Sequence, residues 1–172
     1  MSKCFVEVFD DMHLNDSIAM YFDNALVKRV VINTKVKELQ VYVVFSNIVH
    51  IKFIRQVEKQ IENNLCANSD LTVRIICEYD VKYDLNKLLL LYGDSILYEL
   101  KQFSPICFGI LRKADIEVKD DNVIITLNNN TIDFLKDKEV DKRIEEIING
   151  RFNINTSVSF KVNEKAIENN KK

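Results

Sequence analysis

Glycine is scarce in this sequence: the 172 residues contain only three, Gly93, Gly109 and Gly150. A phosphate-binding loop of the GxxxxGK[ST] or GxGxxG type needs glycines within a few residues of each other, because the backbone must approach the phosphate closely. The spacing here also lacks the GxxG loop with which a KH domain clamps a nucleic-acid backbone. The sequence therefore excludes these nucleotide-binding and nucleic-acid-binding loops.

Metal-ligating side chains are also few and far apart. A structural zinc site needs about four ligands, with cysteines or histidines in close pairs. The cysteines and histidines of this sequence form no such pair: Cys4, His13, His50, Cys66, Cys77 and Cys107. We therefore expect neither a metal nor another cofactor. Cys77 and Cys107 have Ile or Phe neighbours, so we predict that they are buried as small apolar side chains in a reducing compartment.

An excess of charge of one sign is missing too. The chain has 24 basic and 26 acidic residues, closely interspersed, and a formal net charge of -2. Sequence-independent affinity for DNA grows with the number of phosphates that basic side chains neutralise, so a strong grip on nucleic acid is not expected. Lys52, Arg55 and Lys59 fall on one side of a predicted helix and leave room for a local patch. Glu58 and Glu62 lie among them, which favours an ordinary solvated surface.

Long apolar runs are absent. No run approaches the roughly 20 residues that a membrane-spanning helix needs. Residues 1–10 contain one Lys against Glu7 and Asp10 and have no small-residue cleavage site, unlike a secretory signal. The composition, 47% hydrophobic and 29% charged, is typical of a globular chain. We expect a cytoplasmic protein without membrane contact.

The first half of the chain combines β-branched runs with one amphipathic stretch. Its elements are predicted in this order: a helix within 3–21, strands at 27–32 and 39–45, a helix over 51–65 and a strand at 71–79. The short polar link between the first two strands predicts a hairpin, and apolar residues with helical spacing predict the second helix. Arg74 and Glu78 in the last strand indicate that one sheet face is partly exposed.

The second half predicts a similar series. Its elements are a helix over 85–103, a short helix over 105–113, strands at 116–118 and 123–127, a helix over 131–149 and a strand at 157–162. Asp84 is the expected N-cap of the first helix. Ser104 and Pro105 begin the second, with proline at the first helical position. Gly150 is the predicted C-cap of the third.

Both halves therefore follow the order helix–strand–strand–helix–strand, and we predict an α+β protein made of two tandem units. The expected domains are residues 1–82 and 83–163, followed by a polar linker or tail at 164–172. Each unit is predicted to pack helices on one face of a three-stranded sheet, in a degenerate KH-like arrangement. We favour duplication of one unit as the explanation. Chance similarity is the alternative, because such units are common.

No set of residues in the sequence forms a catalytic constellation. His13 and His50 are far apart along the chain, and the acidic pair Asp10-Asp11 has no third carboxylate within reach in the sequence. We therefore predict no catalytic residue and hold a small stand-alone enzyme to be the weakest hypothesis. Phe5 and Phe9, four residues apart, are expected to pack the first helix on its sheet.

Two stretches resemble the amino-terminal region of the PolC-type α chain of bacterial DNA polymerase III. Residues 22–49 are similar to domain I of that family, and their sequence is FDNALVKRVVINTKVKELQVYVVFSNIV. Residues 92–152 are similar to domain II, with the sequence YGDSILYELKQFSPICFGILRKADIEVKDDNVIITLNNNTIDFLKDKEVDKRIEEIINGRF. Where that family usually has a Tyr-Trp pair, this chain has Tyr92-Gly93. The resemblance covers about residues 25–162.

The resemblance implies that residues 1–82 are domain I, which is similar to the α-binding domain of the clamp-loader tau subunit, and that residues 83–163 are the KH-like domain II. It also implies that the polymerase, exonuclease and PHP domains lie downstream, so no catalytic residue is carried over. We predict a non-catalytic interaction and positioning module of a replicative polymerase. Its expected partners are replisome proteins, with tau a candidate, and the downstream polymerase domains; the contacting residues are not predicted. The alternative is a KH-like module that binds single-stranded nucleic acid, weakly given the charge balance and the missing GxxG loops.

Overall fold

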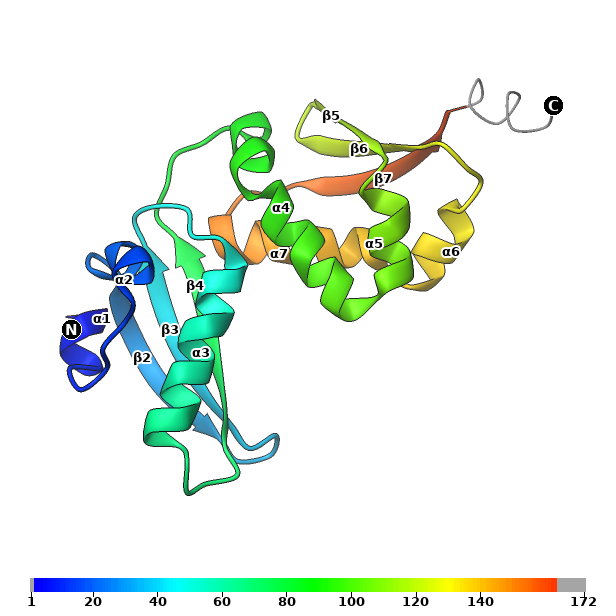
Figure 1. Ribbon diagram of the computed structural model, residues 1–172. Coiled ribbons are helices and arrows are strands. Elements are labelled where there is room, and N and C mark those ends of the chain that lie inside the picture. Colours follow the sequence, from blue (N-terminus) through cyan, green and yellow to red (C-terminus); the bar gives the residue numbers. More distant parts are fainter. Residues whose placement is uncertain (1, 164–172) are drawn as a thin grey trace. The chain divides into compact units, whose positions relative to one another are not determined.

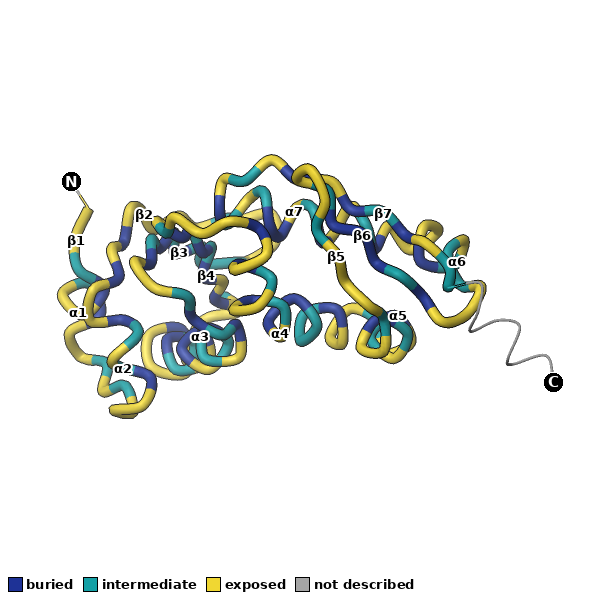
Figure 2. Tube along the Cα trace, turned by 90° about the horizontal axis from the view of Figure 1, so that it is seen from above, coloured by how far each residue is buried: buried dark blue, intermediate teal, exposed yellow. Residues whose placement is uncertain are grey.

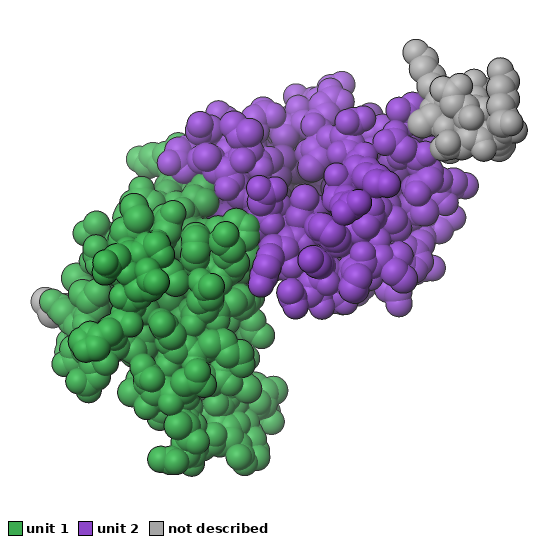
Figure 3. Space-filling view, in the orientation of Figure 1, with its two compact units in different colours: residues 1–82 green, residues 83–172 purple. Residues whose placement is uncertain are grey.

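The computed structural model describes residues 2–163, and the chain divides into two compact units, Met1–Lys82 and Tyr83–Lys172 (Figures 1 and 3). Each unit has a sheet and a hydrophobic core of its own, and helices and strands occur in both. The predicted α+β class is confirmed. The predicted polar tail at 164–172 lies outside the described residues.

Unit 1 is built on a mixed four-stranded sheet with the order β1-β2-β3-β4. Its elements are β1 (Lys3–Cys4), α1 (Phe5–Val8), α2 (Asp16–Phe22), β2 (Leu26–Asn33), β3 (Glu38–Phe45), α3 (Ile51–Leu65) and β4 (Thr72–Tyr79). Strands β2 and β3 form the predicted antiparallel hairpin, whereas β4 runs parallel to β3, from Glu38 opposite Thr72 to Phe45 opposite Tyr79. A helix between β3 and β4 provides the crossover that a parallel pair requires.

The start of unit 1 differs from the prediction in two respects. The expected single helix within 3–21 is two short helices, because Asn15 begins a new one: its side chain accepts a hydrogen bond of 3.0 Å from the backbone N–H of Ser17. The sheet also has four strands instead of three, since Lys3 and Cys4 pair with β2. Two residues are too short to show an alternating pattern, so the sequence carries no signal for β1.

The core of unit 1 lies between the helices and one face of the sheet. Buried residues alternate with more exposed ones along β3 and β4 (dark blue in Figure 2), as predicted from Arg74 and Glu78. Phe5 lies 4.7 Å from the ring centroids of both Phe9 and Phe22, which confirms that Phe5 and Phe9 are core residues. Phe22 of α2 in turn packs against Phe45 of β3, with ring centroids 5.3 Å apart, so aromatic contacts tie the amino-terminal helices to the sheet.

Helix α3 has the predicted bounds, and its N-cap is His50, whose Nδ1 accepts a 3.1 Å hydrogen bond from the N–H of Lys52. Ile54, Val57 and Ile61 on its apolar stripe are fully buried. Leu65, placed on the same stripe by the sequence, is 56% exposed. It is the last residue of the helix, and the chain turns there so that the next residue, Cys66, is buried instead.

Unit 2 has a three-stranded sheet with the order β5-β6-β7. Its elements are α4 (Leu85–Phe103), α5 (Pro105–Leu111), β5 (Asp115–Lys119), β6 (Asn122–Leu127), α6 (Ile132–Asp137), α7 (Val140–Phe152) and β7 (Ser157–Val162). The first two strands are antiparallel and β7 is parallel to β6, so the hairpin–helix–parallel strand order of unit 1 recurs. Helices α4, α5 and α7 lie on one side of the sheet (Figure 1).

The predicted helix starts in unit 2 are confirmed. The Asp84 side chain accepts a 2.8 Å hydrogen bond from the N–H of Lys87, and Ser104 Oγ accepts one of 3.3 Å from the N–H of Cys107. Pro105 occupies the first turn of α5. Cys107 is buried, as is Cys77 in unit 1, in agreement with the prediction.

The predicted helix over 131–149 is wrong in two details. It is divided into α6 and α7 at Glu139, which has a left-handed backbone with φ of 51°. Gly150 is not its C-cap but lies inside α7, and the left-handed C-cap is Asn153, with φ of 52°. Asparagine tolerates this conformation better than most residues, so it can end a helix in place of glycine.

None of the helices within residues 2–163 combines the length and the apolarity that crossing a bilayer demands.

Candidate partner-binding site

The side chains that carry chemistry are dispersed in the described part of the chain. Within residues 2–163 no three His, Cys, Asp or Glu side chains come together in a way that could hold a metal. Asp10, Asp11 and His13 are exposed in the segment between α1 and α2, whereas the His50 side chain caps α3. The structure therefore does not bring these residues together.

The charged side of α3, which the sequence predicts to be solvated, is only partly exposed to solvent. Lys59 is exposed and pairs with Glu62 at 3.2 Å. Glu58, however, is 4% exposed and receives a 2.6 Å hydrogen bond from Arg55 Nη1. Its burial corrects the sequence interpretation, which placed it among solvated charges.

The Glu58 carboxylate is buried against the edge of the sheet, where it binds a backbone N–H group. Its Oε1 accepts a 2.7 Å hydrogen bond from the backbone N–H of Ile75 in the edge strand β4. An edge strand presents unpaired backbone groups, which are costly when they are buried without a partner. A helix carboxylate therefore occupies part of the edge at which another strand would add.

The same device recurs in unit 2. Glu145 of α7 accepts a 2.7 Å hydrogen bond from the backbone N–H of Val158 in the edge strand β7. The local sequences also correspond, since 57–61 reads VEKQI and 144–148 reads IEEII. In both, a buried β-branched residue precedes the glutamate and a buried Ile follows it by three positions. This shared detail favours duplication over chance more strongly than the order of elements does.

The edge of β2 is less protected. Strand β1 pairs only with Leu26 and Val27, and no other strand within residues 2–163 covers the rest of this edge. Beyond the pairing, several apolar residues of β2 and the following turn are exposed: Val30, Val31, Ile32 and Val36. An exposed apolar edge is a place where another chain can add a strand.

The open sheet face of unit 1 carries three basic residues near strands β2 and β4. The Arg29 guanidinium lies 3.9 Å from the ring centroid of Tyr42. Lys28 pairs with Glu78, and Arg74 lies 3.6 Å from Glu38. Two of the three cations thus have carboxylate neighbours, so this face is not a concentrated phosphate-binding patch.

A second charged surface lies on unit 2, at the start of α7. Lys142 Nζ donates a 2.6 Å hydrogen bond to Glu139. This hydrogen bond, together with the positive charge, lowers the pKa of Glu139, and the reciprocal interactions raise the pKa of Lys142. Both side chains are exposed, and such surface pairs contribute little to stability.

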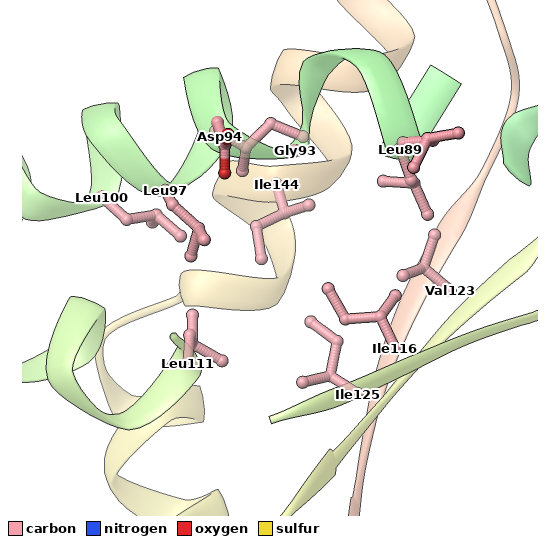
Figure 4. Close-up of a pocket in the computed structure, with 12 residues that line it drawn as sticks. Leu89, Gly93, Asp94, Leu97, Leu100, Leu111, Ile116, Val123, Ile125 and Ile144 are labelled. Carbon is pink, nitrogen blue, oxygen red and sulfur yellow. The ribbon is translucent and has the colours of Figure 1, made fainter. Parts of the chain in front are cut away.

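Unit 2 contains an apolar pocket of about 270 Å³ (Figure 4). It lies between α4, α5, α7 and the β5–β6 hairpin, and most of its lining is aliphatic. The lining residues with the clearest positions in Figure 4 are Leu89, Leu97, Leu111, Ile116, Ile125 and Ile144. Such a wall binds apolar groups and supplies no nucleophile.

Gly93 keeps this pocket open. Leu89, Gly93 and Leu97 are spaced four residues apart on α4 and therefore share one face of the helix. All three line the pocket, and a Cβ atom added at Gly93 would meet nothing within 4 Å. Glycine inside a helix is about 1 kcal/mol less favourable than alanine, so Gly93 lowers the intrinsic stability of α4.

Asp94 is the charged residue of the lining. It is exposed, and its side chain makes no hydrogen bond or ion pair with residues 2–163. Beside it on α4, Leu90 is 77% exposed, and Ile116 of β5 is 52% exposed. The pocket thus has an apolar floor, an apolar rim and one unpaired acid at its mouth.

Sequence reasoning did not identify this pocket, because its walls come from segments far apart in the chain. Two signals for it were present. Residues 88–91 are four consecutive leucines, more than one buried stripe of a helix can hold, so some had to be exposed. Gly93 interrupts the same helical pattern two residues later.

Comparison with protein families gave two matches that fall in the two halves of the chain. Residues 4–75 match the family described as DNA polymerase III polC-type N-terminus I. Residues 91–172 match the family described as DNA polymerase III polC-type N-terminus II. Searches of curated proteins and of solved structures gave no significant match.

Proposed function

This chain belongs to the PolC-type DNA polymerase III family, of which it carries the amino-terminal regions I and II, and from this we propose that it positions a replicative polymerase through contacts with other replisome proteins. The matched regions are non-catalytic parts of a DNA polymerase that acts in DNA replication. Clamp-loader tau and the downstream polymerase domains are the proposed partners, and the cytoplasm is the proposed location. Residues 1–82 and 83–163 act as domains I and II, the second KH-like.

The observation that carries this proposal is the apolar pocket of unit 2 with exposed Leu90 and Ile116 at its rim. Contiguous apolar surface of this kind is a mark of protein–protein contact sites. The exposed edge of β2, with Val30 and Ile32, supports it from unit 1. Both surfaces consist mainly of aliphatic side chains, which can contact a partner protein but cannot act as nucleophiles or general bases.

The test is a calorimetric titration of the full 172-residue chain with purified clamp-loader tau, and then with the other replisome proteins one at a time. We expect at least one to bind with a 1:1 stoichiometry. Heat from none of them, at concentrations up to the highest soluble, contradicts the proposal. Chain unfolded in urea serves as the control for nonspecific association.

Binding of single-stranded nucleic acid is the second candidate function. Arg29 over the ring of Tyr42 favours it, since exposed sheets with aromatic and cationic side chains stack bases. The carboxylate neighbours of Lys28 and Arg74 weaken it. Fluorescence anisotropy with labelled oligonucleotides at several salt concentrations decides: sub-micromolar binding with a steep salt dependence, lost in Tyr42→Ala, would establish this function.

A further inference from the structure

We propose that the pocket of unit 2 receives an aliphatic side chain from an amphipathic helix of a partner protein, and that Asp94 pairs with a Lys or Arg one helical turn from that side chain. The proposal rests on the proposed function, because it names the surface and the partner chemistry through which the chain would make its contacts. The occupant is a helix of another protein, not a cofactor and not a second copy of this chain.

The lining of the pocket indicates an aliphatic group as its occupant. The walls are aliphatic, from Leu89 and Leu97 on one side to Ile116 and Ile125 on the other. One aliphatic anchor inserted between these walls would be buried in the way that central residues of protein interfaces are.

The charge of the occupant follows from Asp94. A docked helix would exclude water from the pocket mouth, and a carboxylate that loses its water without gaining a partner is strongly unfavourable. Asp94 has no partner within residues 2–163, and Lys101 of the same helix lies instead over the ring of Phe108. The docked helix must therefore bring its own cation.

The spacing follows from helix geometry. Partner helices that lie in apolar grooves use anchors three or four residues apart, and residues four apart lie on the same face. The mouth of the pocket has exposed Leu90 and exposed Asp94, themselves four residues apart on α4. A partner helix that lies along α4 in the same direction would place an aliphatic residue, and a Lys or Arg four residues after it, beside this pair of apolar and acidic neighbours.

Two substitutions test the pocket while leaving the fold intact. Gly93→Leu places a side chain into open space, and leucine favours a helix more than glycine does. Asp94→Lys reverses the charge of an exposed side chain. The matched control is Gly109→Leu, since Gly109 lies in α5, does not line the pocket, and also has nothing within 4 Å of an added Cβ.

The probe is a fluorescein-labelled, alanine-based helical peptide with a single Leu and an Arg four residues after it, titrated by anisotropy with the full chain. We expect Gly93→Leu, whose side chain would fill the pocket, and Asp94→Lys, which removes the charge pair, each to weaken binding by about tenfold or more. Gly109→Leu should leave it unchanged. A second peptide with Glu in place of Arg should bind Asp94→Lys better than the original chain. Equal binding of both peptides, or no binding at all, overturns the proposal.

The same variants separate this inference from the proposed function. If a replisome protein binds the original chain and both pocket variants equally, the docking site is wrong and the interaction role stands. If no replisome protein binds, the interaction role fails, and the peptide titration still decides the pocket. Sedimentation velocity tests whether a second copy of this chain occupies the pocket. Self-association that Gly93→Leu abolishes would assign the pocket to that second copy and overturn the proposal.

Discussion

The buried carboxylate of Glu58 in α3 accepts a hydrogen bond of 2.7 Å from the backbone N–H of Ile75 in β4. Glu145 in α7 stands in the same relation to Val158 in β7. Both strands lie at sheet edges, so each bond satisfies a backbone group that has no strand partner on that side. The pair of bonds is a structural reason for a glutamate within the helix that precedes the last strand of each unit.

Removing the first of these carboxylates should destabilise unit 1. Glu58→Ala leaves the N–H of Ile75 and the guanidinium of Arg55 without this acceptor, and hydrogen bonds to charged groups contribute about 1.5–3 kcal/mol. We expect a loss of that size in the free energy of unfolding, measured by urea titration of the amide NMR signals of unit 1. Lys59→Ala, on the exposed side of the same helix, should cost less than about 1 kcal/mol. Equal losses in both variants would show that the buried bond has no special role.

The second carboxylate predicts a local effect on hydrogen exchange. In Glu145→Ala the N–H of Val158 loses its acceptor, so its native-state exchange should become faster, while the exchange of Ile75 in unit 1 should stay as it is. Glu146→Ala is the matched control, because Glu146 is the exposed neighbour of Glu145 on α7. If the Val158 amide exchanges at the same rate in all three chains, the hydrogen bond does not protect the edge.

Much of the fold was predictable because its signals are local. Helix α3 has the predicted bounds, since an apolar stripe with helical spacing specifies a helix without knowledge of its neighbours. The N-caps Asp84 and Ser104 were predictable for the same reason. Each side chain accepts a hydrogen bond from the backbone N–H only three residues later in the sequence. Two-residue β1 carries too few residues for any pattern.

The features that the sequence did not predict depend on contacts between distant segments. Glu58 lies among charged residues in the sequence, which is typical of a solvated helix surface. Its burial depends on β4, whose Ile75 N–H it binds. The pocket likewise has walls from α4 and from the β5–β6 hairpin, which come together only in the folded unit. In contrast, the division of the chain into similar halves was visible in the order of elements, and the glutamate bonds now support it.

The end of α7 distinguishes the predicted helix C-cap from the observed one. If Gly150 were a left-handed C-cap, Gly150→Ala would be destabilising; inside the helix it should instead stabilise the chain by up to about 1 kcal/mol. Asn153→Ala should cost about 1 kcal/mol, because alanine is strained at a φ of 52°. Asn153→Gly should be close to neutral. Thermal unfolding of the three variants measures all these differences, and the reverse order of stabilities would restore the glycine cap.

Arg151 joins α7 to α4 and should be sensitive to a change that keeps its charge. Its Nη1 donates a 2.6 Å hydrogen bond to the Tyr92 hydroxyl, and its Nη2 donates one of 2.9 Å to Glu99. The side chains of Arg151 and Glu99 are largely buried, and a second guanidinium contact to the same carboxylate makes the pair bidentate.

Lysine cannot reproduce this arrangement, because its ammonium is a single point of charge and the guanidinium is a planar fork. We therefore expect Arg151→Lys to lower the free energy of unfolding by about 1–3 kcal/mol, measured by urea denaturation of unit 2. Arg112→Lys is the control, since Arg112 is exposed and lies 5.9 Å from the ring centroid of Phe108; it should change stability by less than about 0.5 kcal/mol. If both substitutions had equally small effects, the bidentate geometry would be dispensable and charge alone would suffice at position 151.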